Sequence, residues 1–154
     1  MQINWAIKTF DELTTRELYA ILQARSEVFV VEQNCAYQDI DDKDKKSLHL
    51  TAWDNEHVAA YCRLLPQGVS FTEASIGRVI TSFGYRGLGL GLQLLEKAIS
   101  EVNSRYQTHQ IKIGAQLYLK KFYEGFGFIQ TSEIYLEDGI EHIDMLLDTT
   151  NHLG

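Results

Sequence analysis

The sequence predicts a single α/β (α+β) domain, and three observations support this fold class. The 154 residues are 45% hydrophobic and 23% charged, which is enough for one buried core. Segments with the helical period alternate with short segments rich in β-branched and aromatic residues, which are typical of strands. No internal repeat, low-complexity tract or linker interrupts this alternation, so we expect residues 1–154 to form one domain.

The first third of the chain predicts a strand, a helix and a long loop. Residues 3–7 alternate in the manner of a strand. Thr14 and Glu17 have the spacing of a capping box, which predicts the start of a helix. This helix should run into a loop, although residues 28–31 (VFVV) also fit a strand. The charged run 39–47 (DIDDKDKKS) mixes both signs, and we expect it to be a solvated loop.

The rest of the chain contains six predicted strands and two predicted helices. Residues 48–54 and 58–65 flank a polar turn and predict a hairpin. Residues 75–83 are a β-branched run that predicts a central strand leading into a glycine-rich stretch. Apolar residues at helical spacing then predict a helix from 88 to about 104. The remaining elements are a strand over 110–115, a helix over 116–124, and strands over 128–135 and 142–147.

Composition and charge argue against several classes of function. Fourteen basic against twenty-one acidic residues give a net charge of -7, which opposes binding to nucleic acid. No segment approaches the roughly 20 apolar residues that cross a bilayer, and the first residues lack the layout of a secretion signal. We therefore expect a cytoplasmic protein with no membrane partner. Cys35 and Cys62 form no CxxC pair and the histidines have no metal-binding spacing, so no metal is expected.

Four glycines lie between residues 84 and 91, at the mouth of a predicted helix. A strand, a glycine-rich turn and a helix together present free backbone NH groups at the positive end of the helix dipole. Glycine adopts positive φ freely and has no Cβ to hold a diphosphate away from those groups. The pattern predicts a phosphate-bearing ligand, although a glycine-rich helix entry without a ligand stays open. The spacing fits neither GxGxxG nor GxxxxGK[ST].

Residues 86–91 (RGLGLG) match the Arg/Gln-x-x-Gly-x-Gly/Ala signature of the GNAT superfamily of N-acetyltransferases. Residues 115–128 (AQLYLKKFYEGFGF) look like the later motif of that superfamily, and residues 18–41 and 135–143 resemble its ElaA-type branch. The resemblance covers nearly the whole chain. It implies a central, mixed but mostly antiparallel sheet of about six to seven strands that splays at the cofactor site, flanked by about four helices.

The resemblance also implies acetyl-CoA as the acyl donor and assigns residues to it. The glycine turn would hold the diphosphate, and backbone NH groups of the preceding strand would pair with the pantetheine arm, one of them facing the thioester oxygen. Gln116 stands where the family often has asparagine and offers the same amide groups. The implied cofactor-binding residues are Val79, Ile80, Thr81, Arg86, Gly87, Leu88, Gly89, Leu90, Gly91, Gln116 and Tyr123.

The implied reaction is direct attack of a primary amine on the thioester in a ternary complex. Tyr123 is the candidate acid, because a phenol stays protonated near neutrality and can donate to the departing thiolate. Some family members carry a glutamate on the strand where this chain has Gly77 and Arg78, so the general base is unassigned. The candidates are Glu32, His49 and His142, of which His142 has the most suitable intrinsic pKa, or an ordered water.

The acceptor is expected to be a small-molecule or protein amine. Glu32, Gln33, Cys35 and Tyr37 lie where the family usually builds the acceptor pocket, and a buried Arg78 would pair either with a carboxylate of the substrate or with an internal acid. The family suggests a homodimer. Two rivals remain: a non-catalytic acyl-CoA sensor or protein-interaction module, and a regulatory domain that binds ADP or NAD.

Overall fold

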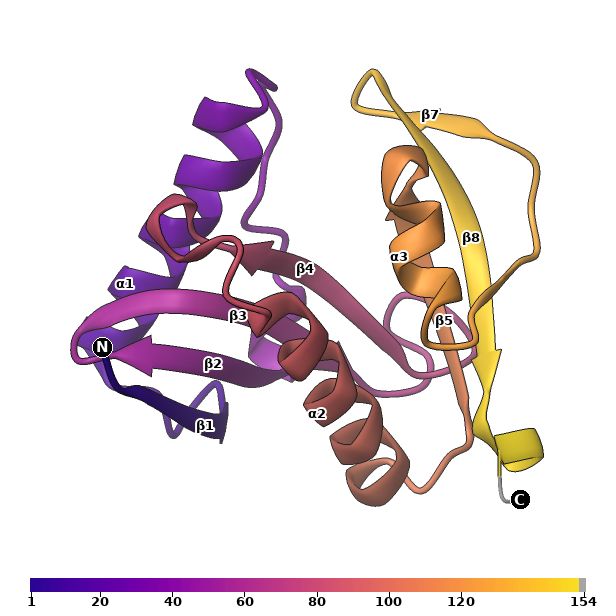
Figure 1. Ribbon diagram of the computed structural model, residues 1–154, viewed down its shortest axis with the longest axis horizontal. Helices are drawn as coiled ribbons and strands as arrows, with labels where there is room; N and C mark the ends of the chain where they lie inside the picture. The colour runs from indigo at the N-terminus through magenta and orange to yellow at the C-terminus, as the bar shows by residue number, and fades with distance from the viewer. Residues whose placement is uncertain (153–154) are drawn as a thin grey trace.

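Two antiparallel sheets that diverge from one seam organise the fold (Figure 1). The structure, a computed structural model, describes residues 1–152, with side chains through residue 150. The first sheet has the order β1-β2-β3-β4, and the second has the order β5-β8-β6 with β7 also paired to β8. The strands are β1 (Ile3–Thr9), β2 (Leu48–Asp54), β3 (His57–Leu65), β4 (Ser75–Thr81), β5 (Gln110–Gln116), β6 (Ile129–Gln130), β7 (Tyr135–Glu137) and β8 (Ile140–Asp148).

The seam between the sheets lies at the start of β4 and β5. A parallel bridge joins Ala74 to Ile111, and the Lys112 amide donates to the Ala74 carbonyl at 2.9 Å. No other bridge between β4 and β5 occurs within residues 1–152. Beyond the seam the two strands diverge, as Figure 1 shows. The sheet therefore splays, as the resemblance to the superfamily implied.

The capping box at the start of α1 (Thr15–Arg25) forms as predicted. The Glu17 amide donates to Thr14 Oγ1 at 3.1 Å, and the Thr14 amide donates to the Glu17 carboxylate at 2.9 Å. The helix then continues as a π-helix over Ser26–Glu32, so residues 28–31 are helical and the strand alternative is wrong. The other α-helices are α2 (Leu90–Arg105) and the short α3 (Lys120–Glu124).

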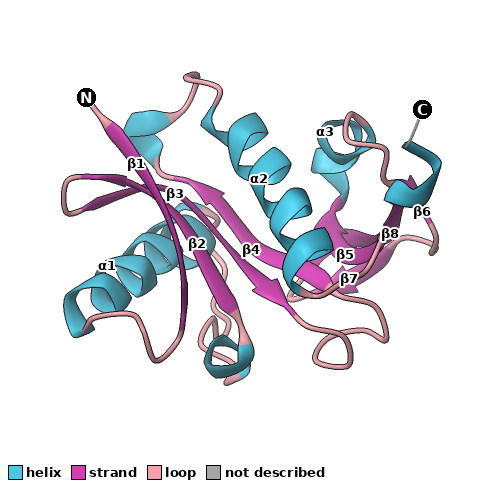
Figure 2. Ribbon diagram, turned by 90° about the horizontal axis from the view of Figure 1, so that it is seen from below, coloured by secondary structure: helices cyan, strands magenta, loops and turns pink. Residues whose placement is uncertain are grey.

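The first sheet is covered on both faces, by α1 on one side and α2 on the other (Figure 2). The alternation of side chains along β3 explains this arrangement. Tyr61 packs with Ile21 of α1, whereas Cys62 and Leu64 share a core cluster with Leu94 of α2. Among the described residues, no helix is long and apolar enough to cross a membrane.

The C-terminal strands differ in detail from the prediction. The expected strand over residues 128–135 divides into β6 and β7, because both short strands pair with the long β8 at different places. Asp138 and Gly139, with φ of 51° and 77°, close the β7-β8 hairpin in the mirror-image turn that hairpins favour. Within residues 1–152 there are thus eight strands and three α-helices, against the expected six to seven strands and about four helices.

The charged run 39–47 is not a solvated loop, and that expectation was wrong. Asp39 and Asp44 are only 8% and 5% exposed. Arg25 is fully buried and lies 2.9 Å from Asp39 and 2.7 Å from Asp44, while Arg63 lies 2.7 Å from Asp41. Burial alone would raise the pKa of Asp44, but hydrogen bonds from the arginines lower it. Asp39 and Asp44 are buried because they compensate arginines from other elements, whereas Asp42 and Lys45 of the same run are exposed.

Candidate active site

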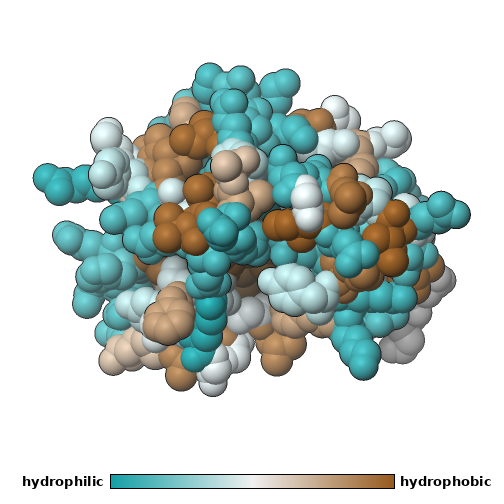
Figure 3. Space-filling view, turned by 90° about the horizontal axis from the view of Figure 1, so that it is seen from above, coloured by the Kyte–Doolittle hydropathy of each residue, from teal (hydrophilic) through white to brown (hydrophobic). Residues whose placement is uncertain are grey.

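A cleft of about 940 Å³ lies between the diverging strands β4 and β5. Figure 3 looks down onto the open side of the molecule and shows hydrophilic and hydrophobic side chains mixed around a hollow. The cleft is lined by the end of the π-helix with its following loop as far as Lys43, the end of β3, residues 70 and 71, β4, the start of α2, and the second sheet with α3. Of the predicted site residues, the lining includes Glu32, Gln33, Cys35, Tyr37, Arg78, Val79, Ile80, Thr81, Arg86, Gly91, Gln116, Tyr123 and His142.

The edge of β4 that faces the cleft makes no strand pairing beyond Ala74 in the described structure. The pairing of β4 with β3 also contains a bulge, because the register passes from Tyr61–Ile80 to Arg63–Gly77 and leaves two residues of β4 opposite Cys62. The bulge places Arg78 at φ 50°, a backbone region that non-glycine residues rarely adopt. The result is a strand edge with backbone groups available along Val79 to Thr81.

The glycine turn before α2 is open toward solvent. Gly87 and Gly89 have φ of 81° and 76°, and a Cβ built on either would meet no atom within 4 Å. Gly89 is the N-cap of α2 and no side chain caps the helix, so the first NH groups of α2 are free. Leu88 is half exposed, whereas Leu90 is 5% exposed and belongs to the core, so only its backbone is available to a ligand.

Gly91 has different surroundings from the other glycines of the turn. A Cβ at this position would lie 3.7 Å from the Phe122 ring and 3.8 Å from Thr81 Oγ1. These are ordinary van der Waals distances, so a Cβ would fit at Gly91. The start of α2 thus lies against α3 and the end of β4, beside the free edge of β4.

Arg86 is held in place by contacts with other residues of the protein. Its Nε donates to the Thr81 carbonyl at 3.0 Å, and its Nη2 donates to Glu32 at 2.8 Å. The guanidinium also lies 5.9 Å from the centre of the Phe83 ring. Glu32, a candidate base and acceptor contact, is thus an ion-pair partner of Arg86 at the edge of the cleft.

Tyr123 is a buried member of an aromatic cluster that reaches the cleft. It is 5% exposed, and its ring packs edge-on against Phe122 and Phe128 with centroid distances of 5.2 and 5.8 Å. Burial raises the pKa of the Tyr123 phenol well above its usual range. The side chain is therefore protonated at neutral pH, but its raised pKa means that it holds the proton more tightly than an ordinary tyrosine does, so donation has to accompany the departure of the thiolate.

The two candidate histidines lie in different environments. His49 is 1% exposed and sits outside the cleft lining, with Nδ1 2.7 Å from Tyr61 Oη and Nε2 2.9 Å from the Asp44 carbonyl. Burial lowers its pKa. His142 lines the cleft, with Nδ1 2.8 Å from the Ile140 carbonyl. The structure therefore removes His49 as a candidate base and keeps His142.

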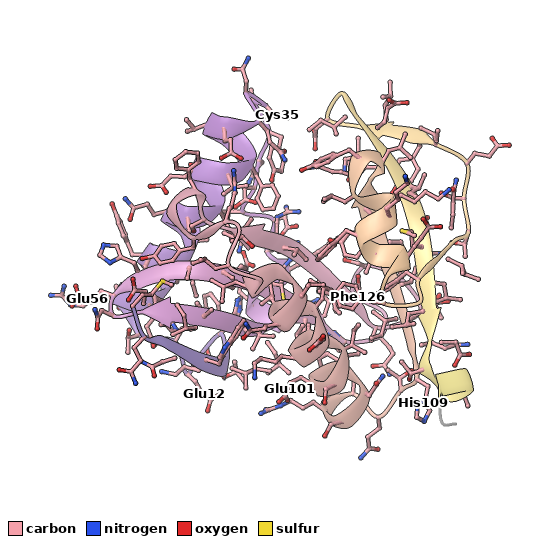
Figure 4. The ribbon with its side chains drawn as sticks, viewed as in Figure 1. Glu12, Cys35, Glu56, Glu101, His109 and Phe126 are labelled. Carbon is pink, nitrogen blue, oxygen red and sulfur yellow. The ribbon has the colours of Figure 1, made fainter. Side chains whose placement is uncertain are left out.

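Two contacts cross the cleft and join the loop after the π-helix to the second sheet. Gln33 and Gln116 exchange amide hydrogen bonds of 3.3 and 3.2 Å. The Cys35 thiol donates to the Asp138 carbonyl at 3.4 Å, and Figure 4 shows Cys35 at the outer end of its loop. These residues, predicted separately for acceptor and cofactor, thus come together at one end of the cleft.

Arg78 and Tyr37 belong to the buried ion-pair network. Arg78 Nε lies 2.8 Å from Asp39, Arg78 Nη2 lies 3.2 Å from Asp41, and the Tyr37 ring lies 5.6 Å from the Arg78 guanidinium. The sequence left two partners open for Arg78, a carboxylate of the substrate or an internal acid. In the described structure Arg78 pairs with the internal acids Asp39 and Asp41. The charge of Arg78 is balanced without a substrate carboxylate.

Several cleft residues were missed by the sequence analysis. Lys43 lay in the run assigned to solvent, Tyr135 lay in the block 135–143 without an assigned role, and Asp144 lay outside the motifs. A signal for Asp144 did exist: His142 and Asp144 alternate with the buried Ile143 and Met145, so one face of this strand is polar. Among the described residues, no group of three or more His, Cys, Asp or Glu side chains is placed to hold a metal.

The class of protein is an acyltransferase that uses an acyl-CoA. Three features agree with this class: the splayed sheet, the uncapped glycine turn, and the cleft between β4 and β5. The chain belongs to the GNAT acetyltransferase family, because the sequence profile described as "Acetyltransferase (GNAT) domain" matches residues 11–149. The predicted resemblance to this superfamily is confirmed.

Individual relatives support the same assignment. Protein ElaA of Escherichia coli K12 is 43% identical over 145 residues, which cover 93% of this chain and 95% of ElaA. The crystal structure of E. coli ElaA matches with a TM-score of 0.89 and 41% identity, covering 96% of this chain and 100% of that one. The crystal structure of an acyl-CoA N-acyltransferase from Pseudomonas aeruginosa matches with a TM-score of 0.90 and 41% identity. The match covers 95% of this chain and 99% of that one. The predicted ElaA-type branch is confirmed.

Proposed function

We propose that this protein transfers an acetyl group from acetyl-CoA to a primary amine. The observation that carries the proposal is the uncapped, positive-φ glycine turn of α2, which opens beside the free edge of β4. The diphosphate of the cofactor binds the free NH groups of Gly87 to Gly91, where the helix dipole favours negative charge. Arg86 exchanges its contact with Glu32 for the diphosphate.

The pantetheine arm lies along the free edge of β4. Backbone NH groups of Val79 to Thr81 pair with the arm, and one of them stabilises the thioester oxygen as it becomes an oxyanion. The bulge at Arg78 supports this assignment, because a bulge turns backbone groups away from the neighbouring strand. Gln116 contacts the arm from the opposite wall.

The reaction needs two proton transfers. The neutral amine attacks the thioester carbon, the C–N bond forms, and the C–S bond breaks with the electron pair leaving on sulfur. Tyr123 donates its proton to the thiolate. His142 accepts the amine proton at Nε2, because Nδ1 faces the Ile140 carbonyl and is the protonated nitrogen of the neutral ring. Nε2 also lies 3.5 Å from Glu137 Oε2, and this carboxylate stabilises the imidazolium that forms.

Release of free CoA thiol tests this function directly. Acetyl-CoA is incubated with the protein and a panel of small primary amines, and free thiol is measured with a chromogenic disulfide. We expect release that depends on both the protein and an amine. Binding of CoA without release for any amine, peptide lysines included, would favour the acyl-CoA sensor. Displacement of bound acetyl-CoA by NAD or ATP as readily as by CoA would favour a nucleotide-binding domain.

Other expectations stay predictions from the sequence. They are the extent of one domain over residues 1–154, a cytoplasmic location, a possible homodimer and the absence of a metal cofactor. None of them enters the mechanism. The contacts of Gln33, Cys35 and Tyr37 with the acceptor are part of the proposal, supported by their place in the cleft lining.

A further inference from the structure

A tyrosine and a carboxylate form a fixed pair in the cleft that the proposed chemistry does not use. The Tyr135 hydroxyl donates to Asp144 Oδ1 at 2.7 Å, and both side chains line the cleft. Gly114 of β5 lies under this pair, since a Cβ at Gly114 would be 3.1 Å from the Tyr135 hydroxyl and 3.9 Å from Asp144. The second oxygen of Asp144 is left available to a cationic group.

A lysine with spare hydrogen-bond donors faces the same part of the cleft. Lys43 Nζ donates to Ser70 Oγ at 3.0 Å, and among the described side chains no carboxylate lies within 4.0 Å of it. An ammonium has three donors, so further donors remain for an anion. Arg63 and Arg78 also line the cleft, but both are already paired with aspartates.

Residues 70 and 71 connect the lysine to the carboxylate. Ser70 holds Lys43, and the ring of its neighbour Phe71 lies 4.0 Å from the Cβ position of Gly114, beneath Tyr135 and Asp144. Lys112 Nζ also lies 5.2 Å from the centre of the Phe71 ring, but Lys112 is not part of the cleft lining. Within the lining, Lys43 is next to Ser70 and Asp144 is next to Phe71, so these two residues have a positive group on one side and a negative group on the other. This arrangement fits a ligand that carries an ammonium and a carboxylate close together.

Counting residues from the seam gives the distance along the strands between Asp144 and the free edge of β4. Counted from the parallel bridge between Ala74 and Ile111, Gly114 and Gly77 are each three residues beyond the seam, and the bulge of β4 follows directly after Gly77. Two residues along a strand span about 7 Å. Asp144, which pairs with Gly114, is therefore set back by about 7 Å along the strand direction from the free edge at Val79, a length that an extended four-carbon stem can span.

We propose that the acceptor is a free diamino acid of the lysine or ornithine type. Its α-carboxylate binds Lys43, its α-ammonium binds Asp144 as held by Tyr135, and its side-chain amine reaches the thioester at Val79. This inference rests on the proposed acetyl transfer and adds the substrate class. Lys43, Tyr135 and Asp144 are specificity-determining residues in it, and the proton transfers stay with Tyr123 and His142.

Three amines that differ by one group test the proposal by thiol release. L-lysine has both α groups, cadaverine lacks the carboxylate, and ε-aminocaproate lacks the α-amine. We expect kcat/KM for L-lysine to exceed that for either analogue by about 10-fold or more, because each analogue leaves a charged partner unsatisfied. Equal kcat/KM values for L-lysine and both analogues would overturn the proposal.

Variants assign each charge to its residue. Lys43→Met should lower kcat/KM for L-lysine and ε-aminocaproate by about 10-fold and leave cadaverine unchanged. Asp144→Asn should lower kcat/KM for L-lysine and leave kcat/KM for ε-aminocaproate unchanged. Tyr135→Phe keeps the carboxylate and should give a smaller loss with L-lysine. A uniform loss over all three amines would contradict the assignment.

The CoA affinity of each variant, measured by calorimetry, separates the two proposals. If CoA affinity is intact and many amines release thiol with no preference for L-lysine, the proposal of a diamino acid acceptor is overturned and the acetyl transfer is not. No thiol release with any amine overturns the acetyl transfer itself. Loss of CoA affinity in Asp144→Asn would show a folding defect, and Tyr135→Phe and Lys43→Met then decide the question.

Discussion

Gly89→Ala tests the anion-binding turn, because this residue combines a positive φ with open space. Gly89 has φ 76°, and an added Cβ would meet no protein atom within 4 Å. The substitution therefore strains the backbone without a clash in the free protein. In the complex, the same methyl group stands where the diphosphate approaches the NH groups of α2.

Gly139→Ala is the matched control. Gly139 has φ 77°, also has no atom within 4 Å of a built Cβ, and lies in the β7-β8 hairpin away from α2. Forcing an L-residue into this region costs about 1–2 kcal/mol in either variant. For a chain of this size each kcal/mol lowers Tm by about 2–4 °C, so both variants should lose about 2–8 °C.

Only the Gly89 variant should lose affinity for CoA. Each charge-assisted hydrogen bond to the diphosphate contributes about 1.5–3 kcal/mol, so losing one raises Kd by about 10- to 100-fold. Calorimetric titration with CoA below the unfolding temperature gives the Kd of both variants. If Gly89→Ala and Gly139→Ala lost stability alike and both bound CoA as wild type does, the turn would not be the diphosphate site.

Three further predictions concern catalysis, stability and thiol chemistry. Tyr123→Phe should lower kcat by about 100-fold or more with unchanged CoA affinity, and normal turnover would remove Tyr123 from the mechanism. Arg25→Met should lower the free energy of unfolding in urea by about 3–5 kcal/mol, because it leaves buried carboxylates uncompensated. Since the pKa of Asp44 is lowered in the fold, the wild type should lose stability as the pH falls below about 4, and the variant should show a shallower dependence. Iodoacetamide should label half-buried Cys35 but not Cys62, whose thiol pKa is raised by burial; equal labelling, read by mass spectrometry, would contradict the burial of Cys62.

Local signals in the sequence predicted the features that depend on neighbouring residues. The capping box at Thr14 and Glu17 and the glycine turn at residues 86–91 each lie within one stretch of chain, and the structure contains both. The β2-β3 hairpin was predicted for the same reason, because its strands and polar turn are contiguous.

Features that depend on distant residues were not predictable from the same signals. Asp44 looks solvated in its run of charges, and only its contacts with Arg25 and Arg63, each 19 residues away, show that it is buried. The bulge at Arg78 depends on the register with β3, which no local pattern sets. Asp144 and Tyr135 meet in the cleft because β7 folds back on β8, and no local pattern says which side chains meet across these two strands.

The central claim is that the start of α2 binds the diphosphate of coenzyme A. Calorimetric titration of the wild-type protein with CoA and, in parallel, with pantetheine tests it most directly, because pantetheine has the arm that lies along β4 but no diphosphate. The account predicts saturable binding of CoA and an affinity for pantetheine at least about 100-fold weaker. No heat of binding with CoA, or equal affinities for CoA and pantetheine, would contradict it.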